Sequence, residues 1–288
     1  MKLLITGASG FLGGRAAAML GDRFEVLAPG HAQLEITDRE AVRRYFREAR
    51  PDLVFHCAAM SDVGQCEREP ERSRRINIDG ARNIAGAASE IGAKCLLCSS
   101  DQVYAGSTVM EAHREDEAVE PAPLYGREKL SAERECLAVN PDAVLLRLTW
   151  MYDTETIVPG EKSDFFRGLL ARRKEGAPLR YSLHDRRGLT YVRDVVRNLV
   201  PAFELPGGVY NFGSPNTLPV GRTMAETVRE IFRRAGLDPS AVEGDAGSTP
   251  SAERNLCMDP AKLESYGIRF PETSERIGEL LAGARLSL

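Results

Sequence analysis

The sequence of 288 residues has few cysteines, few aromatic side chains and no long apolar run. Six cysteines are too sparse for a disulfide scaffold, and no apolar stretch approaches the ~18 residues that a transmembrane helix needs. A secretory signal is lacking too, because the short apolar start at residues 1–5 leads directly into glycines. We therefore expect a cytoplasmic protein with reduced thiols and no membrane partner.

An excess of charge of one sign is also lacking. Lysine and arginine total 38 against 42 acidic residues, and the basic residues are scattered or lie beside acids, so no nucleic-acid partner is expected.

The four histidines show no metal-ligand spacing. Cys95 and Cys98 form a C-x-x-C, but on a strand two residues three apart point to opposite faces. We expect no protein-bound metal.

What the sequence does have is a regular alternation of short apolar runs and amphipathic segments, which is typical of βαβ units and a parallel sheet. The predicted strands of the first half are 2–6, 24–28, 53–56, 94–99 and 143–148. The predicted helices between them are 11–20, 39–48, 72–91 and 124–139. We expect an α/β fold with a Rossmann-type, doubly wound parallel sheet.

After Trp150 the alternation changes and glycine and proline become more frequent. Predicted elements here are helices near 164–174, 192–203, 221–235 and 260–266, a short helix after 273, and strands near 179–182 and 209–212. We assign residues 1–155 to the Rossmann domain, completed by elements near 190–213. Residues 156–189 and 214–288 then form a smaller, interleaved C-terminal lobe that binds substrate.

A glycine-rich turn joins the first predicted strand to the first helix. Its glycines let the backbone turn tightly and let a pyrophosphate approach the free N–H groups at the helix start, where the helix dipole favours an anion. A plain strand-to-helix turn is the weaker alternative. The predicted dinucleotide contacts in this turn are Gly7, Ser9, Gly10, Phe11, Leu12 and Gly13. Small residues after the third strand, Ala58 and Ala59, would let the cofactor pass over the sheet edge.

Two further motifs indicate chemistry at the same edge of the sheet. The fourth strand ends near Ser100, and Tyr125 and Lys129 lie one helical turn apart at the start of a predicted helix. A neighbouring ammonium favours the ionised form of a phenol, so Tyr125 could exchange a proton with a carbonyl or hydroxyl group. Taken alone, the Tyr-x-x-x-Lys pair is typical of a surface helix pair; the glycine turn and the hydroxyl favour catalysis.

Together these elements resemble the extended short-chain dehydrogenase/reductase family over most of residues 1–152, including the segment around Asn77, which falls on the family's helix asparagine. The resemblance implies an NAD(P)-dependent oxidoreductase. It implies that Ser100 hydrogen-bonds the substrate carbonyl, that Tyr125 donates the proton, and that Lys129 holds the nicotinamide ribose beside Tyr125.

Within that family the sequence is most similar to the dTDP-4-dehydrorhamnose reductases. Residues 34–38 resemble their D-[IV]-T-D, residues 66–71 their A-E-x-E-P-E, and residues 147–152 their R-T-S-W-V-Y. This implies reduction of a 4-keto nucleotide sugar, a small-molecule substrate, with Trp150 packed on the sugar; an interdomain core position is the alternative for Trp150. In the segment that corresponds to their S-T-D-Y-V-F, Gln102 stands in place of the tyrosine, next to Asp101. In the segment that corresponds to their R-P-x-N, Ala252 stands in place of the arginine. Arg254, two residues along, could take over the role of that arginine. The expected substrate contacts are thus Asp101, Gln102, Trp150 and Arg254.

Cofactor choice depends on the end of the second strand. NAD-specific Rossmann proteins place a carboxylate there for the ribose 2′-hydroxyl, but this strand ends at Ala28 and the following loop reaches His31 without one. The resemblance assigns Glu35 and Ile36 to the adenine side. We expect His31 to serve partly in place of an arginine, with NADP(H) favoured and NAD(H) also used; a solvent-exposed loop position is the alternative for His31.

Two other functions remain open. A sugar-nucleotide epimerase or dehydratase would share the fold, but dehydratases of this family place Asp-Glu after the catalytic hydroxyl residue, and the amide of Gln102 cannot remove a carbon-bound proton. A non-catalytic, nucleotide-binding regulatory subunit is the second, since fold does not fix function. The one protein partner that we consider is a second copy of the chain, in a homodimer.

Overall fold

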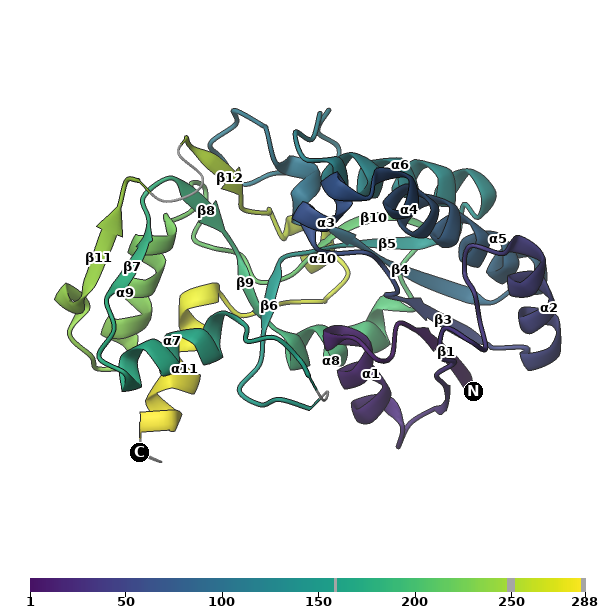
Figure 1. The fold of residues 1–288 in the computed structure, drawn as a ribbon, viewed down its shortest axis with the longest axis horizontal. Coiled ribbons are helices and arrows are strands. Elements are labelled where there is room, and N and C mark those ends of the chain that lie inside the picture. The colour runs from purple at the N-terminus through teal and green to yellow at the C-terminus, as the bar shows by residue number, and fades with distance from the viewer. Residues whose placement is uncertain (158–159, 248–251, 286–288) are drawn as a thin grey trace.

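A computed structural model describes residues 1–157, 160–247 and 252–285, and its centre is a parallel sheet of six strands (Figure 1). The strand order is β10-β5-β4-β3-β1-β2. The strands are β1 (Lys2–Thr6), β2 (Glu25–Leu27), β3 (Leu53–His56), β4 (Lys94–Ser100), β5 (Val144–Leu148) and β10 (Gly208–Phe212). Almost every residue of β1, β3 and β5 is buried, as expected for a parallel sheet with helices on both faces.

Helices cover both faces of this sheet. One face carries α1 (Phe11–Leu20) and α8 (Val192–Ala202), and the other carries α2 (Arg39–Ala49), α5 (Ala81–Ile91) and α6 (Leu124–Val139). Cys95 packs in the core of the second face and Cys98 against the core of the first, so the two thiols do point apart. The predicted doubly wound, Rossmann-type fold is confirmed.

The chain order in the sheet places a crevice between β1 and β3. From β1 the chain runs to β2 at the edge, then crosses through α2 to β3 on the other side of β1. In open α/β sheets, ligands bind at such a switch point, outside the carboxyl ends of the strands. The glycine turn after β1 and the small residues after β3 both lie there.

The prediction of one continuous helix over residues 72–91 was wrong, because the structure divides this segment. The chain forms α3 (Val63–Arg68), α4 (Pro70–Arg74), a π-helical segment η1 (Arg75–Gly80) and then α5. Gly80 packs so tightly on Ile36 that a β-carbon there would lie 2.8 Å from Cδ1 of that side chain. Asn77 lies in this π-helical segment, and its side chain reaches the loop after β3.

The C-terminal lobe combines helices with three short parallel strand pairs, at the left of Figure 1. The pairs are β6 (Trp150–Tyr152) with β9 (Leu189–Tyr191), β7 (Leu179–Ser182) with β11 (Val242–Asp245), and β8 (Asp185–Arg187) with β12 (Arg254–Leu256). Its helices are α7 (Phe165–Lys174), α9 (Met224–Arg234) and α11 (Thr273–Arg285), whereas the short α10 (Ala261–Glu264) packs Leu263 into the core of the large sheet. The sequence predicted only one of these six strands, β7. Helix α9 begins three residues later than predicted, because Thr223 and Glu226 form a capping box.

We retain the division into a Rossmann domain and a substrate lobe as a proposal. Strand β10 and helix α8 lie far along the chain yet join the large sheet. Residues 158–159, 248–251 and 286–288 of the proposed lobe lie outside the described residues.

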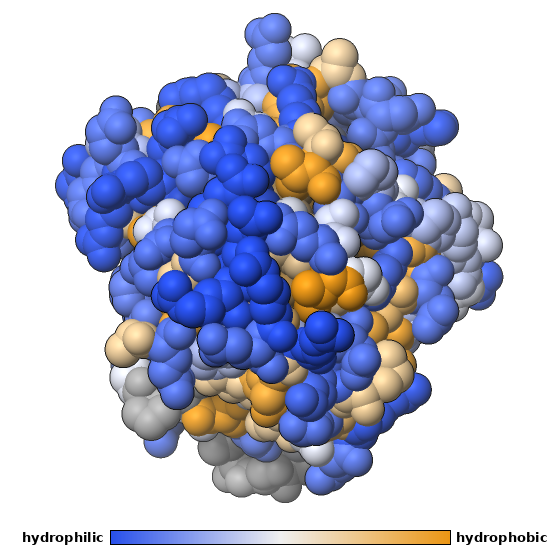
Figure 2. All heavy atoms as spheres, turned by 90° about the vertical axis from the view of Figure 1, so that its right-hand side faces the viewer, coloured by the Kyte–Doolittle hydropathy of each residue, from blue (hydrophilic) through white to orange (hydrophobic). Residues whose placement is uncertain are grey.

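The surface at the α2 end of the molecule is mainly hydrophilic, with apolar groups in small separate spots (Figure 2). Helix α2 explains part of this pattern, because Val42 and Phe46 face the core while Arg39, Arg44 and Arg47 are exposed. None of the described helices has both the length and the apolar character that crossing a bilayer would demand.

Candidate active site

A cleft of about 1080 Å³ runs along the carboxyl ends of the parallel strands, into the crevice between β1 and β3. It brings together almost all residues that the sequence singled out. Those lining it are Gly7, Ser9, Gly10, Phe11, Leu12, Gly13, His31, Glu35, Ile36, Ala58, Ala59, Ser100, Asp101, Gln102, Tyr125, Lys129 and Trp150. Arg254 is the exception: its guanidinium makes two 2.9 Å contacts with the carboxylate of Asp185, and it is not part of the lining.

The glycine turn has the shape that a bound diphosphate requires. Gly7 has a φ of +73°, a left-handed conformation that favours glycine, and its backbone abuts Ala58. A β-carbon on Gly13 would lie 2.3 Å from the carbonyl oxygen of Gly7. Helix α1 follows Gly10, whose position before the helix is not capped by a side chain, and the turn from Gly7 to Gly13 lines the cleft. The cradle fits the diphosphate of a dinucleotide.

Two elements present the candidate catalytic groups. Strand β4 ends at Ser100, whose hydroxyl lies close enough to the phenol of Tyr125, at the start of α6, to affect its pKa. One turn along α6, Nζ of Lys129 donates to the carbonyl oxygen of Cys98 at 2.9 Å and lies 5.6 Å from the centre of the Tyr125 ring. Ser100, Tyr125 and Lys129 are all at least nine-tenths buried. They form one constellation at the floor of the cleft.

The protonation of Tyr125 differs from the expectation. Burial raises the pKa of its phenol above the ordinary value, and the carboxylate of Asp101 acts in the same direction, while the neighbouring hydroxyl of Ser100 opposes them. Burial also lowers the pKa of Lys129. The sequence suggested a phenol made more acidic by Lys129, but loss of hydration disfavours phenolate more strongly. Tyr125 therefore keeps its proton at neutral pH, as a proton donor must.

Asn77 joins the loop after β3 to helix α6. Its side-chain oxygen accepts from the backbone N–H of Met60 at 2.9 Å, and its amide nitrogen donates to the Met60 carbonyl at 3.0 Å and to Glu128 at 2.9 Å. Ser73 donates to the same carboxylate oxygen of Glu128 at 2.5 Å. Since Glu128 precedes Lys129 on α6, this buried network fixes the helix that carries Tyr125.

Arg187, which the sequence did not point to, lies in the cleft beside Trp150. Its Nη2 is 2.8 Å from Oδ2 of Asp101, and its Cζ is 5.1 Å from the centre of the Trp150 ring. Trp150 is 43% exposed, so the core position considered for it does not apply. The sequence signal was slight: Arg187 ends a strand of three residues, and its approach to Asp101 depends on distant strand pairs.

At the other end of the cleft, Nε2 of His31 lies 3.0 Å from a carboxylate oxygen of Glu35. Although partial burial opposes the effect, hydrogen bonds from the backbone and hydroxyl of Thr37 lower the pKa of Glu35. An ionised carboxylate thus stands beside His31, where the sequence predicted none. It opposes the attraction of His31 for a 2′-phosphate.

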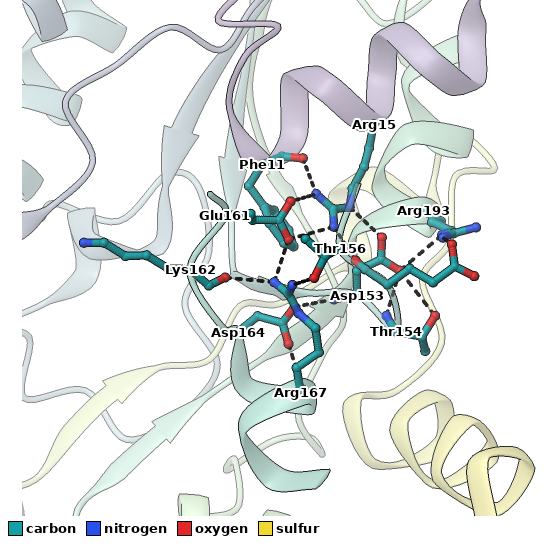
Figure 3. Close-up of polar contacts among 11 residues, drawn as sticks. Phe11, Arg15, Asp153, Thr154, Thr156, Glu161, Lys162, Asp164, Arg167 and Arg193 are labelled. Carbon is teal, nitrogen blue, oxygen red and sulfur yellow. Dashed lines mark hydrogen bonds and ion pairs between the residues drawn. The ribbon is translucent and has the colours of Figure 1, made fainter. Parts of the chain in front are cut away.

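A charged cluster fastens the loop after β6 to the glycine-turn helix (Figure 3). Arg15 of α1 is 99% buried; its guanidinium contacts Asp153 at 2.5 Å and Glu161 at 2.8 Å, and donates to the carbonyl oxygen of Phe11. Arg167 of α7 contacts Glu161 from the other side at 2.6 Å. Glu161 to Asp164 line the cleft, so this cluster also shapes the site, and no motif in the sequence indicated it.

No group of three or more candidate metal ligands occurs among the residues that the structure describes. Burial raises the pKa of the Cys98 thiol to about 12, so this cleft residue stays a neutral thiol.

Comparison with known proteins gives a consistent family. The chain is 34% identical to a dTDP-4-dehydrorhamnose reductase of Streptomyces griseus, over 99% of the chain and 98% of the relative. It is 27% identical to methionine adenosyltransferase 2 subunit beta of Pongo abelii, over 96% and 85%. The structure of dTDP-4-dehydrorhamnose reductase from Bacillus anthracis, in complex with NADP, shares the fold with a TM-score of 0.82 at 23% identity, over 100% and 98%. The family described as RmlD substrate binding domain matches residues 1–283, and the chain belongs to this family.

Proposed function

We propose that this chain is an NADPH-dependent oxidoreductase that reduces the 4-keto group of a nucleotide sugar, in the manner of dTDP-4-dehydrorhamnose reductase. One observation carries the proposal: Ser100, Tyr125 and Lys129 form a buried constellation in the same cleft as the glycine cradle. The relative of 34% identity that aligns along nearly the whole chain bears that name.

Gly7 to Gly13 and the N-terminus of α1 would hold the diphosphate of the cofactor, and Lys129 its nicotinamide ribose. When bound, reduced nicotinamide supplies a hydride to the carbonyl carbon. Tyr125 donates its proton to the carbonyl oxygen, and Ser100 hydrogen-bonds the same oxygen. The ammonium of Lys129 lies close enough to stabilise the phenolate that Tyr125 becomes.

We propose Asp101, Gln102 and Trp150 as the sugar-facing wall, because all three line the cleft next to Ser100. Arg254 is withdrawn from this set, since its charge is satisfied by Asp185 outside the lining. The half-exposed indole of Trp150 offers the flat apolar face that a sugar ring packs on. Homodimer formation and a cytoplasmic location stay predictions; light scattering of the purified protein checks the first and cell fractionation the second.

A nucleotide-binding regulatory subunit is the second candidate, favoured by the likeness to methionine adenosyltransferase 2 subunit beta. Against it stands the constellation: a subunit that only binds nucleotide has no need of a protonated, buried phenol beside a serine hydroxyl and a lysine.

The deciding experiment offers dTDP-, UDP-, GDP- and CDP-linked 4-keto sugars to the protein and follows NADPH and NADH absorbance. We expect oxidation of NADPH with at least one of these sugars, and slower oxidation of NADH. If no sugar is reduced although calorimetry shows that NADPH binds, the regulatory subunit is the better description.

A further inference from the structure

Arg187 links the substrate lobe to the catalytic hydroxyl groups. It ends β8, and its Nη2 contacts Oδ2 of Asp101 at 2.8 Å, while its guanidinium also faces the ring of Trp150. The other oxygen of the Asp101 carboxylate accepts from the hydroxyl of Ser100 at 3.2 Å. Ser100 in turn lies beside Tyr125 in the cleft, and its hydroxyl affects the pKa of the phenol. A continuous polar chain therefore runs from Arg187 through Asp101 and Ser100 to the proton donor.

Asp101 brings a negative charge to the place where the proposed reaction develops another. Its side chain is 98% buried, and a carboxylate so deep in the protein needs a cation in contact. Its charge is felt at the phenol, because it raises the pKa of Tyr125. When hydride reaches a carbonyl carbon, negative charge grows on the carbonyl oxygen, and an uncompensated carboxylate nearby would oppose that growth.

Four described titratable groups interact with the carboxylate of Asp101, by contact or through their charge. Arg187 contacts it from β8, and Tyr125 faces it from α6. Arg254, from β12, acts on it at longer range while contacting Asp185, and the neutral thiol of Cys257 follows β12. Arg187 is the cation that touches Asp101.

Resting on the proposed function, we propose that Arg187 is a positioning residue that neutralises Asp101 beside Ser100 and Tyr125, and so permits negative charge to develop on the substrate oxygen. Arg187 acts through Asp101 and not on the reacting atoms. The substrate lobe thereby supplies part of the electrostatics of a site whose hydroxyl groups belong to the Rossmann domain.

The test is a charge-compensation series in the full-length protein. Arg187→Met should lower kcat about tenfold or more near pH 8, because Asp101 then stays ionised without its cation. The loss should shrink toward pH 6, because protonation removes a buried negative charge that no longer has a cation in contact. Arg187→Lys keeps the charge and should keep most of the rate. Adding Asp101→Asn to Arg187→Met should raise kcat again and remove the new pH dependence.

Arg180→Met is the matched control, since Arg180 pairs with Glu243 at an exposed site on the same lobe, and it should leave kcat unchanged. If Arg187→Met keeps the wild-type pH profile, or the double variant is no faster than the single one, the proposal is wrong. Circular dichroism identifies a variant that has not folded, and Arg187→Lys then carries the test.

A second readout does not need turnover. Trp150 is the single tryptophan of the chain, so its fluorescence reports on this site. In Arg187→Met its emission should titrate with pH, and Asp101→Asn should abolish that titration. If Asp101→Asn leaves the pH dependence of the emission unchanged, the proposal is wrong, even if none of the sugars is reduced. If no sugar is reduced but the emission titrates as expected, only the proposed function is wrong.

Discussion

Tyr125 is the residue on which the proposed reaction depends most, and its burial decides its form. A phenol in water already keeps its proton at neutral pH, and here the pKa is raised further because phenolate would lose its hydration. This direction suits reduction, in which the phenol must arrive protonated. Lys129 contributes at the next moment, when the phenol gives up its proton.

Tyr125→Phe should therefore lower the rate of sugar reduction by about 10²- to 10⁴-fold, the usual contribution of a general acid. The ring stays in place, so the dissociation constant of NADPH should hardly change. Initial rates and a fluorescence titration with NADPH measure the two effects. A variant that keeps more than half of the wild-type rate would exclude Tyr125 as the proton donor.

A second residue-scale prediction concerns cofactor choice. The carboxylate of Glu35 lies 3.0 Å from His31, and it would repel the 2′-phosphate of NADPH. Glu35→Gln should raise the NADPH-to-NADH ratio of kcat/KM about fivefold, since a contact between unit charges in water is worth ~1 kcal/mol. His31→Ala should lower that ratio. If both variants keep the wild-type ratio, this pair of residues does not face the ribose.

At the scale of elements, the sequence predicted well wherever a repeating pattern is long. Strand β4 and helix α6 each carry enough apolar residues to show their period, so the sequence alone placed Ser100, Tyr125 and Lys129 at one edge of the sheet. Strands such as β6, β8 and β12 have three residues each and therefore no period to detect. Arg187 was missed for that reason. Arg254 was assigned to substrate from the resemblance to the R-P-x-N segment, and its partner Asp185, on another undetected strand, could not be foreseen.

Ion pairs also join the loop after β6 to helix α1, and no pattern in the sequence predicted them. The buried carboxylates of Asp153 and Glu161 share the guanidinium of Arg15, with Arg193 and Arg167 behind them (Figure 3). Such a cluster needs all its charges, because removing one cation leaves a carboxylate buried without a full set of partners.

Arg15→Met should therefore lower the free energy of unfolding by about 3–5 kcal/mol, the usual cost of breaking a buried pair. Urea unfolding measures this change, with Arg180→Met as the control, which should match the wild type because its ion pair is exposed. Equal stability of the two variants would show that the cluster of Figure 3 does not hold the loop to α1.

At the scale of the whole molecule, burial keeps the imidazole of His56 uncharged in the interior of the folded protein. His56 is the last residue of β3 and is 97% buried, and its Nδ1 lies 2.7 Å from the hydroxyl of Thr6. Burial, assisted by the charge of Lys129, lowers the pKa of His56 to about 3. In the unfolded chain the same imidazole has a pKa near ~6.5.

This difference predicts how stability depends on pH. Between pH ~6.5 and ~3 the unfolded chain binds a proton at His56 that the folded chain does not, so acid favours unfolding. The free energy of unfolding should fall by about 1.6 kcal/mol from pH ~6.5 to pH ~5, where most carboxyl groups are still ionised, with a slope that approaches ~1.4 kcal/mol per pH unit. Urea unfolding at these two pH values measures the slope. His56→Gln, which keeps a polar group beside Thr6 but cannot titrate, should be less stable at pH ~6.5 yet lose much less stability on acidification. A variant with the wild-type slope would mean that His56 is protonated in the folded protein as readily as in the unfolded chain, and that the interior beneath the cleft is wetter than the burial of this side chain indicates.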